Sequence, residues 1–266
     1  MFTFRRLTLV FFLILLCLNL WSIFQGKLTG GAVHTHVALL YSLLLFFYFG
    51  LSFAFAFLPC TNFHHPVTCR GNMDEKSVAI SFDDGPHPAY TPAILDILQK
   101  HQVKATFFCI GKNISNNRAL LKRMDEQGHL IGNHSFSHSK WFGFFSSRRI
   151  RAELVETDNL IQGVIGKTPA FFRPPFGVVN PMVSKALKKM HWQTVCWTIR
   201  TFDTMENEPR KISRKILKQL KPGAIILLHD FTPFSQHHLE ELILSIQNAG
   251  YTIVPMDYVL NLPAYV

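Results

Sequence analysis

The spacing of apolar residues divides the chain into two parts. Residues 7–24 (LTLVFFLILLCLNLWSIF) and 37–58 (VALLYSLLLFFYFGLSFAFAFL) are predominantly apolar and carry no charged side chain. Each stretch is long enough for an α-helix that crosses a lipid bilayer. The pattern therefore predicts an integral membrane protein, in which residues 1–66 form an anchor of two transmembrane helices, about 7–24 and 37–58, joined by a short loop at residues 25–36.

Each apolar stretch also has an alternative interpretation. A secretory signal peptide would begin with basic residues such as Arg5 and Arg6, but Trp21, Phe24 and Gln25 occupy the place where small residues mark a cleavage site. A buried core helix would account for the second stretch, but so long a run without a charge argues against it. Two spans remain the better interpretation.

From residue 67 onward, short apolar runs typical of strands alternate with amphipathic segments typical of helices. Strands are predicted over residues 77–82, 104–110, 129–133, 170–172, 191–199, 224–229 and 251–254. Helices are predicted over residues 91–101, 116–127, 146–165, 180–189, 207–220 and 237–249, with Thr91 and Asn180 as caps. This alternation predicts an α/β domain over residues 67–266, a (β/α) barrel that is either closed or incomplete, with a doubly wound open sheet as the alternative.

Charge is distributed unevenly between the two parts. Residues 1–66 contain no acidic residue and only Arg5, Arg6 and Lys27 as basic ones, whereas residues 67–266 hold 24 basic and 17 acidic residues, a net charge of +7. This excess suits an anionic membrane surface, although ordinary solubilising charge explains it equally well. No basic helix with interleaved aromatic residues is present, so nucleic-acid binding is not expected. The Lys/Arg bias slightly favours the cytoplasmic side for residues 67–266.

The five cysteines include no C-x-x-C pair. Cys60 and Cys69 are close enough in sequence to form a disulfide if this part of the chain is exported. The cysteine pattern alone does not establish the redox compartment.

Polar residues gather where the predicted strands end. SFDDGPHP (residues 81–88) places Asp83 and Asp84 after the first strand of the α/β part, and His134 and His138 (HSFSH) follow the third. In a β/α barrel, functional residues lie at the C-terminal ends of the strands. Successive strand side chains point in opposite directions, so adjacent carboxylates reach one site only if the strand turns there. The Gly-Pro that follows provides such a turn.

These four side chains predict a metal site. Two histidines four residues apart lie on one face of a helical turn and can hold the same ion. Together with one aspartate they leave a coordination position open for water, as a catalytic Zn²⁺ site requires. The second aspartate can then accept a proton from that water. The histidine pair alone is a weak signal, so the prediction depends on the neighbouring carboxylates.

Five segments together resemble a known family. SFDDGPHP, KATFFCIG, GHLIGNHSFSH, FRPPFG and GAIILLHD are similar, in order and spacing, to the motifs of the NodB-homology polysaccharide deacetylases, carbohydrate esterase family 4. The resemblance covers residues 77–266, about three quarters of the chain. It implies a distorted (β/α) barrel and a metal-dependent hydrolase that removes N-acetyl or similar acyl groups from the aminosugars of a glycan.

The resemblance also implies the catalytic residues. Asp83 would be the general base, and Arg173 would keep it ionised and oriented, since a nearby positive charge lowers the pKa of a carboxyl group. His229 would protonate the leaving amine. Asp84 would be a metal ligand beside the two histidines.

The remaining family roles concern the ion and the substrate pocket. The ligands of a divalent metal, with Zn²⁺ as the expected ion, would be Asp84, His134 and His138. The backbone N–H of Phe176 would help to stabilise the oxyanion. Trp197 and Leu227 would form the walls of the pocket for the small acyl group.

One segment departs from the family pattern. In WTIRTFDT, Arg200 stands where the family often has an aspartate that tunes the catalytic histidine, and Asp203 is followed by Thr204 instead of tryptophan. Asp203 is a candidate partner of Arg173 or His229, and an exposed loop position is an equal alternative. The departure leaves the predicted metal ligands and base in place.

Three functions are open from the sequence. The first is a membrane-anchored N-deacetylase of a polysaccharide, and the second is a deacylase or deformylase of a lipid-linked aminosugar, which a cytoplasmic domain would favour. The third, from a different class, is a non-catalytic glycan-binding relative, and the intact ligands, base and acid argue against it.

Overall fold

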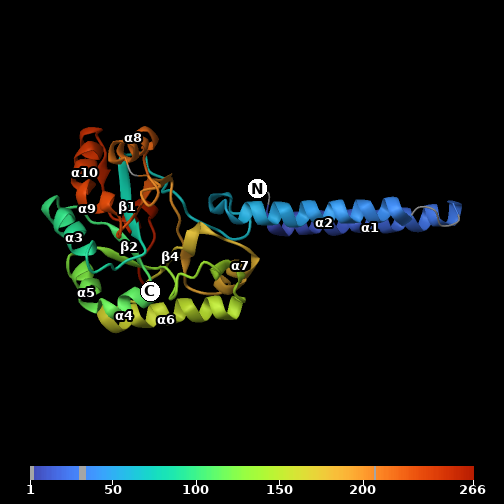
Figure 1. The fold of residues 1–266 in the computed structure, drawn as a ribbon, viewed down its shortest axis with the longest axis horizontal. Coiled ribbons are helices and arrows are strands. Elements are labelled where there is room, and N and C mark those ends of the chain that lie inside the picture. Colours follow the sequence, from blue (N-terminus) through green and yellow to red (C-terminus); the bar gives the residue numbers. More distant parts are fainter. Residues whose placement is uncertain (1–2, 30–33, 207) are drawn as a thin grey trace.

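The computed structural model describes residues 3–29, 34–206 and 208–266. Two long N-terminal helices precede a domain of alternating strands and helices (Figure 1). The α-helices are α1 (Phe4–Thr29), α2 (His34–Ala56), α3 (Thr91–Lys100), α4 (Gly111–Asn116), α5 (Arg118–Glu126), α6 (Ser147–Ile165), α7 (Pro181–Leu187), α8 (Pro209–Gln219), α9 (Pro233–His237), α10 (Leu239–Asn248) and α11 (Met256–Leu260). The strands are β1 (Ser77–Asp83), β2 (Thr106–Cys109), β3 (Leu130–Asn133), β4 (Phe171–Phe172), β5 (Gln193–Thr194), β6 (Ile199–Arg200), β7 (Ala224–His229) and β8 (Thr252–Ile253). Short 3₁₀ turns are η1 (Pro59–Thr61), η2 (Phe142–Phe144) and η3 (Pro175–Gly177).

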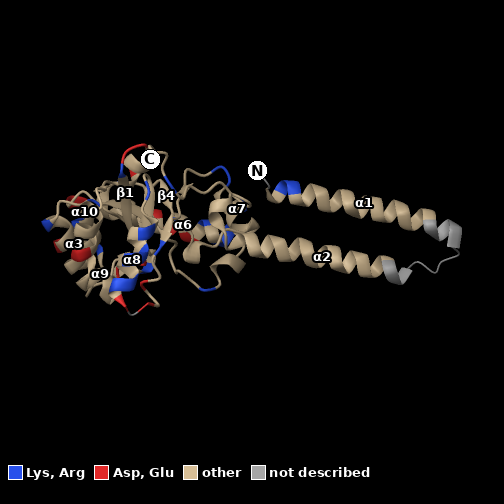
Figure 2. Ribbon diagram, turned by 90° about the horizontal axis from the view of Figure 1, so that it is seen from above, with Lys and Arg blue, Asp and Glu red and all other residues tan. Residues whose placement is uncertain are grey.

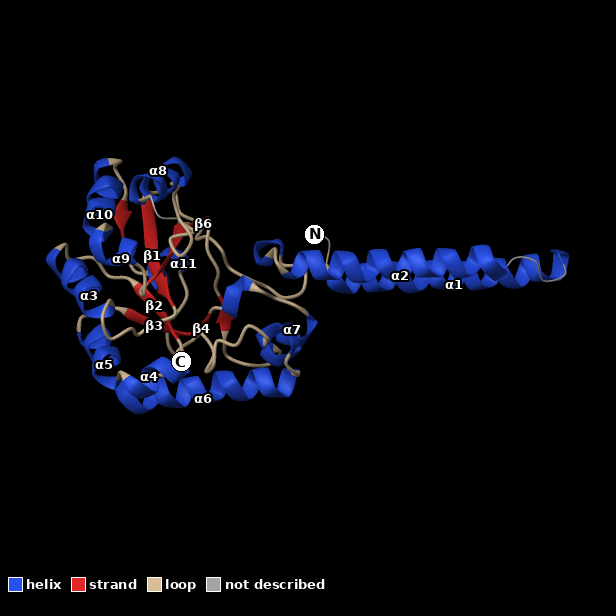
Figure 3. Cartoon of the chain, viewed as in Figure 1, coloured by secondary structure: helices blue, strands red, loops and turns tan. Residues whose placement is uncertain are grey.

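All the strands join one parallel sheet, which is curled into a half-barrel (Figure 3). The strand order is β5-β4-β3-β2-β1-β7-β6, and β8 also pairs with β1. Among the described residues the two end strands, β5 and β6, do not pair with each other. Instead, the segment that enters the domain makes single bridges from Thr68 to Val195 and from Arg70 to Ala224. The predicted barrel is therefore present in its incomplete form.

The alternation of side chains along β1 explains how the core leads to a polar site. Val78, Ile80 and Phe82 pack into the apolar core between the sheet and its outer helices. On the opposite face Ala79 packs into the interior of the half-barrel. Because side chains alternate along a strand, Asp83 continues this inner face at the end of β1.

The strand register brings the polar ends of three strands to one edge of the sheet. Asp83 lies opposite Phe108 of β2 and opposite His229 of β7. Asn133, the last residue of β3, is paired with Cys109 of β2. The segments that follow β1, β3 and β7 therefore begin at the same edge of the sheet, with β2 between β1 and β3.

The predicted strand over residues 191–199 is wrong in its extent. The structure has two separate two-residue strands, β5 and β6. Between them, the carbonyl oxygens of Val195 and Cys196 accept hydrogen bonds from the buried Arg173 at 3.1 Å each. The chain bends here to direct carbonyl groups at a charged side chain, a requirement that an apolar sequence pattern does not reveal.

Several helix boundaries also differ from the predictions. The helices expected over residues 116–127 and 237–249 are present as α5 and α10, and each is preceded by a short helix, α4 and α9, that was not predicted. Thr91 is the first residue of α3 and not its cap; its hydroxyl donates to Asp230 at 2.7 Å and accepts the N–H of His87 at 2.7 Å. Asn180 caps α7 as expected, accepting from the N–H groups of Met182 and Val183.

The N-terminal helices α1 and α2 form an antiparallel pair that projects from the domain as a rod (Figure 1). Both have the length and apolar composition of a membrane span. The predicted loop at residues 25–36 is shorter in the structure, because α1 continues to Thr29 and α2 begins at His34. The pair is joined to the domain at its base, where the N–H of Phe4 donates to the carbonyl of Phe63 and that of Val179 to the carbonyl of Ala56.

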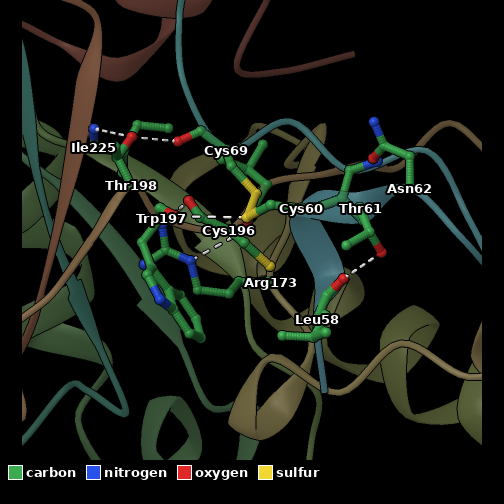
Figure 4. The surroundings of a disulfide bond; sticks show 12 residues. Leu58, Cys60, Thr61, Asn62, Cys69, Arg173, Cys196, Trp197, Thr198 and Ile225 are labelled. Atoms are coloured by element: carbon green, nitrogen blue, oxygen red, sulfur yellow. Dashed lines mark hydrogen bonds between the residues drawn. A yellow bond between two sulfur atoms is a disulfide. The ribbon is translucent and has the colours of Figure 1, made fainter. Parts of the chain in front are cut away.

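A disulfide follows directly after the helical pair. Cys60 and Cys69, separated by nine positions, are bonded with their Cα atoms 5.8 Å apart. Figure 4 shows this disulfide against the backbone of residues 196–198, where the N–H of Cys196 donates to Thr68 and the hydroxyl of Thr198 donates to the carbonyl of Cys69 at 2.6 Å. It thus joins the end of the hairpin to the open edge of the half-barrel.

Candidate active site

The turn at the end of β1 directs two adjacent carboxylates into one pocket. Asp83 still has strand geometry, but Asp84 adopts a left-handed conformation with φ 76°. Asn113 donates to the carbonyl of Asp84 at 2.7 Å and holds this turn. Gly85 is required next, because a Cβ atom there would lie 2.0 Å from Oδ2 of the buried Asp230. Side chains of neighbouring strand residues point in opposite directions, but the strand ends at Asp83 and the chain turns at Asp84, so both carboxylates face the same pocket.

Asp84, His134 and His138 form a cluster suited to a metal ion. Oδ1 of Asp84 lies 3.4 Å from Nε2 of His134 and 3.2 Å from Nε2 of His138. One ligand atom from each residue lies within 4.8 Å of the others. Nδ1 of His134 is 2.7 Å from the carbonyl of Arg173, and an N–H on that nitrogen leaves Nε2 free for a metal.

The hydrogen bonding of Asp84 indicates that this cluster suits a cation. Oδ1 of Asp84 is buried and makes no hydrogen bond within the described structure. A buried carboxylate oxygen without a donor is costly unless a cation satisfies it. Two imidazole nitrogens and one carboxylate also match the ligand set of a catalytic Zn²⁺ site. The residues present therefore fit a divalent metal.

The electrostatics of this cluster are consistent with cation binding. Burial alone would raise the pKa of Asp84, but its interactions with His134, His138 and His229 lower it to about 2. Burial and repulsion by His134 lower the pKa of His138 to about 4. At neutral pH, Asp84 is thus ionised and His138 is neutral, the forms that coordinate metals.

Asp83 faces the same pocket but is held by a different partner. Its Oδ1 accepts a hydrogen bond from the guanidinium of Arg173 at 2.6 Å, and both side chains are buried. Arg173 also donates to the hydroxyl of Ser81 at 2.8 Å, and its guanidinium lies 3.9 Å from the centre of the Phe108 ring. Oδ2 of Asp83 remains 3.8 Å from Nε2 of His134, on the metal side.

His229 at the end of β7 approaches the pocket from the opposite side. Its Nδ1 lies 2.9 Å from Oδ1 of Asp203, and Oδ2 of Asp203 accepts the backbone N–H of His229 at 2.9 Å. The hydroxyls of Thr201 and Thr232 donate to the same carboxylate at 2.7 and 3.1 Å. Burial opposes the charged form of His229, but the contact with Asp203 raises its pKa overall. Of the two partners considered for Asp203, the structure places it beside His229.

The groups converge on a cavity of about 240 Å³, large enough for a small acyl group and part of a sugar ring. The predicted pocket residues Phe176, Trp197 and Leu227 line it, together with Arg200 and Phe202. Phe176 has φ 59° within η3, and its ring lies 4.7 Å from that of His138. The next residue must be glycine, since a Cβ on Gly177 would lie 2.5 Å from the Trp197 indole.

Sequence reasoning missed several residues that support the site. Asn113 holds the Asp84 turn, and Glu153 of α6 accepts from both the N–H and the hydroxyl of Ser137, which orients the loop carrying the two histidines. Glu153 lies on a predicted helix, and Asn113 lies in the short helix α4, which was not predicted. No local sequence signal distinguishes them, because their partners are set by helix packing.

Comparison with known proteins assigns the chain to a family. The polysaccharide deacetylase family model matches residues 70–195. A peptidoglycan-N-acetylmuramic acid deacetylase of Bacillus subtilis is 35% identical over 191 residues, which cover 70% of this chain and 72% of the relative. The chain belongs to the polysaccharide deacetylase family. The fold agrees: a solved peptidoglycan N-acetylglucosamine deacetylase has a TM-score of 0.69 at 28% identity, covering 74% of this chain and 94% of its own.

A second solved polysaccharide deacetylase shows why the site must be examined residue by residue. A Bacillus anthracis protein described as a carbohydrate esterase family 4 pseudoenzyme has a TM-score of 0.68 at 29% identity, covering 73% of this chain and 68% of its own. Proteins of this fold therefore include one without the enzymatic role. In this chain Asp83, Asp84, His134, His138 and His229 all line one cavity.

Proposed function

We propose that the protein is a metal-dependent N-deacetylase that acts on the N-acetylated aminosugars of a cell-wall glycan. The single observation that carries this proposal is the cavity in which a three-residue ligand cluster, an Arg-bound carboxylate and an Asp-bound histidine face one another. The similarity to peptidoglycan deacetylases supports the acetylated aminosugar as the substrate class.

The residues divide the reaction between two sides of the cavity. Asp84, His134 and His138 would hold the ion, which we propose to be Zn²⁺. When bound, the ion would supply Lewis-acid polarisation of the acetyl carbonyl and activation of water. Asp83, held in place by the hydrogen bond from Arg173, accepts the proton from the attacking water.

The remaining steps use groups on the other side. His229 donates a proton to the amide nitrogen, so that the C–N bond breaks to give acetate and a free amine. Burial opposes its charged form, but the contact with Asp203 raises its pKa overall, which favours the protonated form that this step uses. The backbone N–H of Phe176 is proposed to stabilise the oxyanion, and the rings of Trp197 and Phe176 exclude water from the acetyl group.

The disulfide between Cys60 and Cys69 indicates on which side of the membrane the catalytic domain lies. Disulfides persist in oxidising compartments and are rare in the cytosol. We therefore propose that α1 and α2 anchor the protein in the membrane with the catalytic domain on the outer face, the reverse of the side that the Lys/Arg bias favours. This placement also gives access to a cell-wall glycan. A periplasm-dependent reporter fused after Val266 tests it, and activity of a cytoplasm-dependent reporter would contradict it.

The function is tested with the full chain in detergent or nanodiscs. Zn²⁺-loaded protein is expected to release acetate from an N-acetylated chitooligosaccharide or from purified peptidoglycan, with one free amine formed for each acetate. Chelation should abolish release and added Zn²⁺ should restore it. Binding of the same glycans without any acetate release would instead support the non-catalytic alternative.

A further inference from the structure

A second cavity lies next to the catalytic one, at the base of the hairpin. It has a volume of about 390 Å³ and is lined by residues 57–61, which connect α2 to the domain, and by Trp197, Arg200, Phe202 and Lys215. Trp197, Arg200 and Phe202 also line the catalytic cavity. The two hollows are therefore adjacent and share these three side chains; together they extend from the end of the hairpin to the metal cluster, and we refer to them as the path.

The far end of this path is apolar and faces the expected membrane surface. Phe57 and Leu58, the first residues after α2, are 54% and 53% exposed although they belong to the domain junction. Exposed large apolar residues in a groove mark a site for an apolar ligand or a bilayer. The disulfide at Cys60 forms the adjoining wall, with its Cys60 sulfur 3.6 Å from the Trp197 carbonyl. The junction is thus a fixed surface and not a loose linker.

The middle of the path holds two cations on one aromatic ring. The guanidinium of Arg200 lies 4.7 Å, and the ammonium of Lys215 4.0 Å, from the centre of the Phe202 ring. Among the described residues no ion pair is formed by either cation; Glu206, which pairs with Lys211 at 2.7 Å, also attracts Lys215, but from beyond ion-pair distance. Two positive charges that share one ring repel each other, so an anion between them would be stabilised. Figure 2 shows Lys and Arg positions along α8, the helix that carries Lys215.

The position of Arg200 restricts where the anionic group sits on a substrate. Arg200 lines both cavities, so its partner must be close to the acylated nitrogen that enters the catalytic cavity. In a 2-acylaminosugar linked through a 1-phosphate, the phosphate and the nitrogen occupy neighbouring ring carbons. A phosphate at this position reaches Arg200 while the acyl group reaches the ligand cluster, and a lipid on the phosphate continues toward Phe57 and Leu58.

We propose that this second cavity binds the phosphate and the first part of the lipid of a lipid-linked N-acylated aminosugar, which is a membrane substrate of the same catalytic site. This proposal rests on the proposed deacetylase activity and names a substrate class for it. Arg200 and Lys215 bind the phosphate by charge-assisted hydrogen bonds, and Phe57 and Leu58 contact the lipid. Arg200, which departs from the family pattern, thereby acquires a role in substrate recognition.

Binding is measured first, without turnover. The probe is radiolabelled geranyl phosphate, applied to metal-free full chain in neutral detergent micelles, with geraniol and inorganic phosphate as competitors. Lys215→Gln and Arg200→Gln should each weaken geranyl phosphate binding by roughly tenfold, the usual range for one charge-assisted hydrogen bond. Arg214→Gln, on the same helix but lining a different hollow, removes the same charge and should have no effect.

Turnover is then compared on two substrates that share the acetylated sugar. The ratio of kcat/KM for a polyprenyl-phosphate-linked N-acetylglucosamine to that for a chitooligosaccharide should fall about tenfold in Lys215→Gln and remain constant in Arg214→Gln. The inference would be overturned if Lys215→Gln and Arg214→Gln changed this ratio equally. It would also be overturned if geraniol competed for binding as well as geranyl phosphate does. Stronger competition by an N-acetylmuramic acid oligosaccharide, whose carboxylate would then be the anion, would overturn it as well. Failure of the proposed activity itself would appear separately, as absence of acetate release from both substrates.

Discussion

The two sides of the catalytic cavity are built differently. The metal side, defined as Asp84, His134 and His138, has a buried carboxylate oxygen that no donor satisfies. The acid side, defined as His229 and Asp203, has both carboxylate oxygens occupied by hydrogen bonds from His229 and two threonines. One side is incomplete without a ligand and the other is complete by itself. Removing a cation should therefore disturb the metal side and leave the acid side in place.

The largest expected effect comes from the metal side. His134→Ala and Asp84→Ala should abolish acetate release and lower the bound metal below one ion per chain, because an incomplete ligand set binds Zn²⁺ poorly. Metal content is measured after dialysis, alongside acetate release. His87→Ala is the matched control, since this histidine lies in the same turn but is not in the cluster. Full metal content in His134→Ala would show that the cluster is misassigned.

The next effect tests the carboxylate between the two sides. Asp83→Asn should lower kcat by roughly 10²–10⁴-fold, the contribution of a general base. Metal content should remain at the wild-type level, because Asp83 is held by Arg173 and is not part of the cluster. The amide oxygen of the new side chain can still accept the hydrogen bond from Arg173, so the buried guanidinium does not lose a partner. Loss of metal in this variant would mean that both aspartates are ligands.

The two sides also differ in how far the sequence predicts them. The metal side follows from local spacing: two adjacent aspartates at a strand end and two histidines four residues apart. The sequence predicts a turn at the Gly85-Pro86 that follows, but not the left-handed φ of Asp84 itself. The alternation of apolar runs was likewise sufficient for the parallel α/β architecture, although a closed and an incomplete barrel give the same pattern.

The acid side depends on contacts that no local pattern contains. Asp203 and His229 are 26 positions apart, and their pairing requires the loop after β6 to fold back over the end of β7. The bent segment between β5 and β6 is set by the carbonyl groups that Arg173 requires. Polar contacts of this kind override an apolar strand pattern because a buried guanidinium must be satisfied. The family resemblance suggests the histidine, but the sequence left Asp203 with Arg173 or His229 as its partner, or with an exposed loop position; the structure pairs it with His229.

A smaller effect is expected on the acid side. The Asp203 carboxylate favours the protonated form of His229, so Asp203→Asn should lower the His229 pKa. The step that His229 assists needs its protonated form, and the alkaline limb of the kcat/KM–pH profile should therefore move to lower pH. At a pH above the His229 pKa of both proteins, kcat/KM of the variant should be lower than that of the wild type by about tenfold for each unit by which the His229 pKa is lowered. Metal content should be unchanged. An unmoved alkaline limb would contradict the role of Asp203 as the residue that positions and charges His229.

The smallest effect on catalysis is expected at the wall behind both sides. Replacing Cys60 and Cys69 together by serine removes a cross-link that closes a short loop, which typically lowers the free energy of unfolding by about 2–4 kcal/mol. The catalytic groups remain held by their own hydrogen bonds, and the Cys60 sulfur contacts the backbone of Trp197, so kcat on a chitooligosaccharide should change by less than about threefold. Thermal unfolding of the double variant is compared with that of the wild type, each with and without reductant. If the disulfide is the cause, reductant should lower the stability of the wild type to that of the double variant. It should not lower the stability of the double variant further. A large loss of kcat would instead show that the wall, and with it the path from the hairpin, positions the metal side directly.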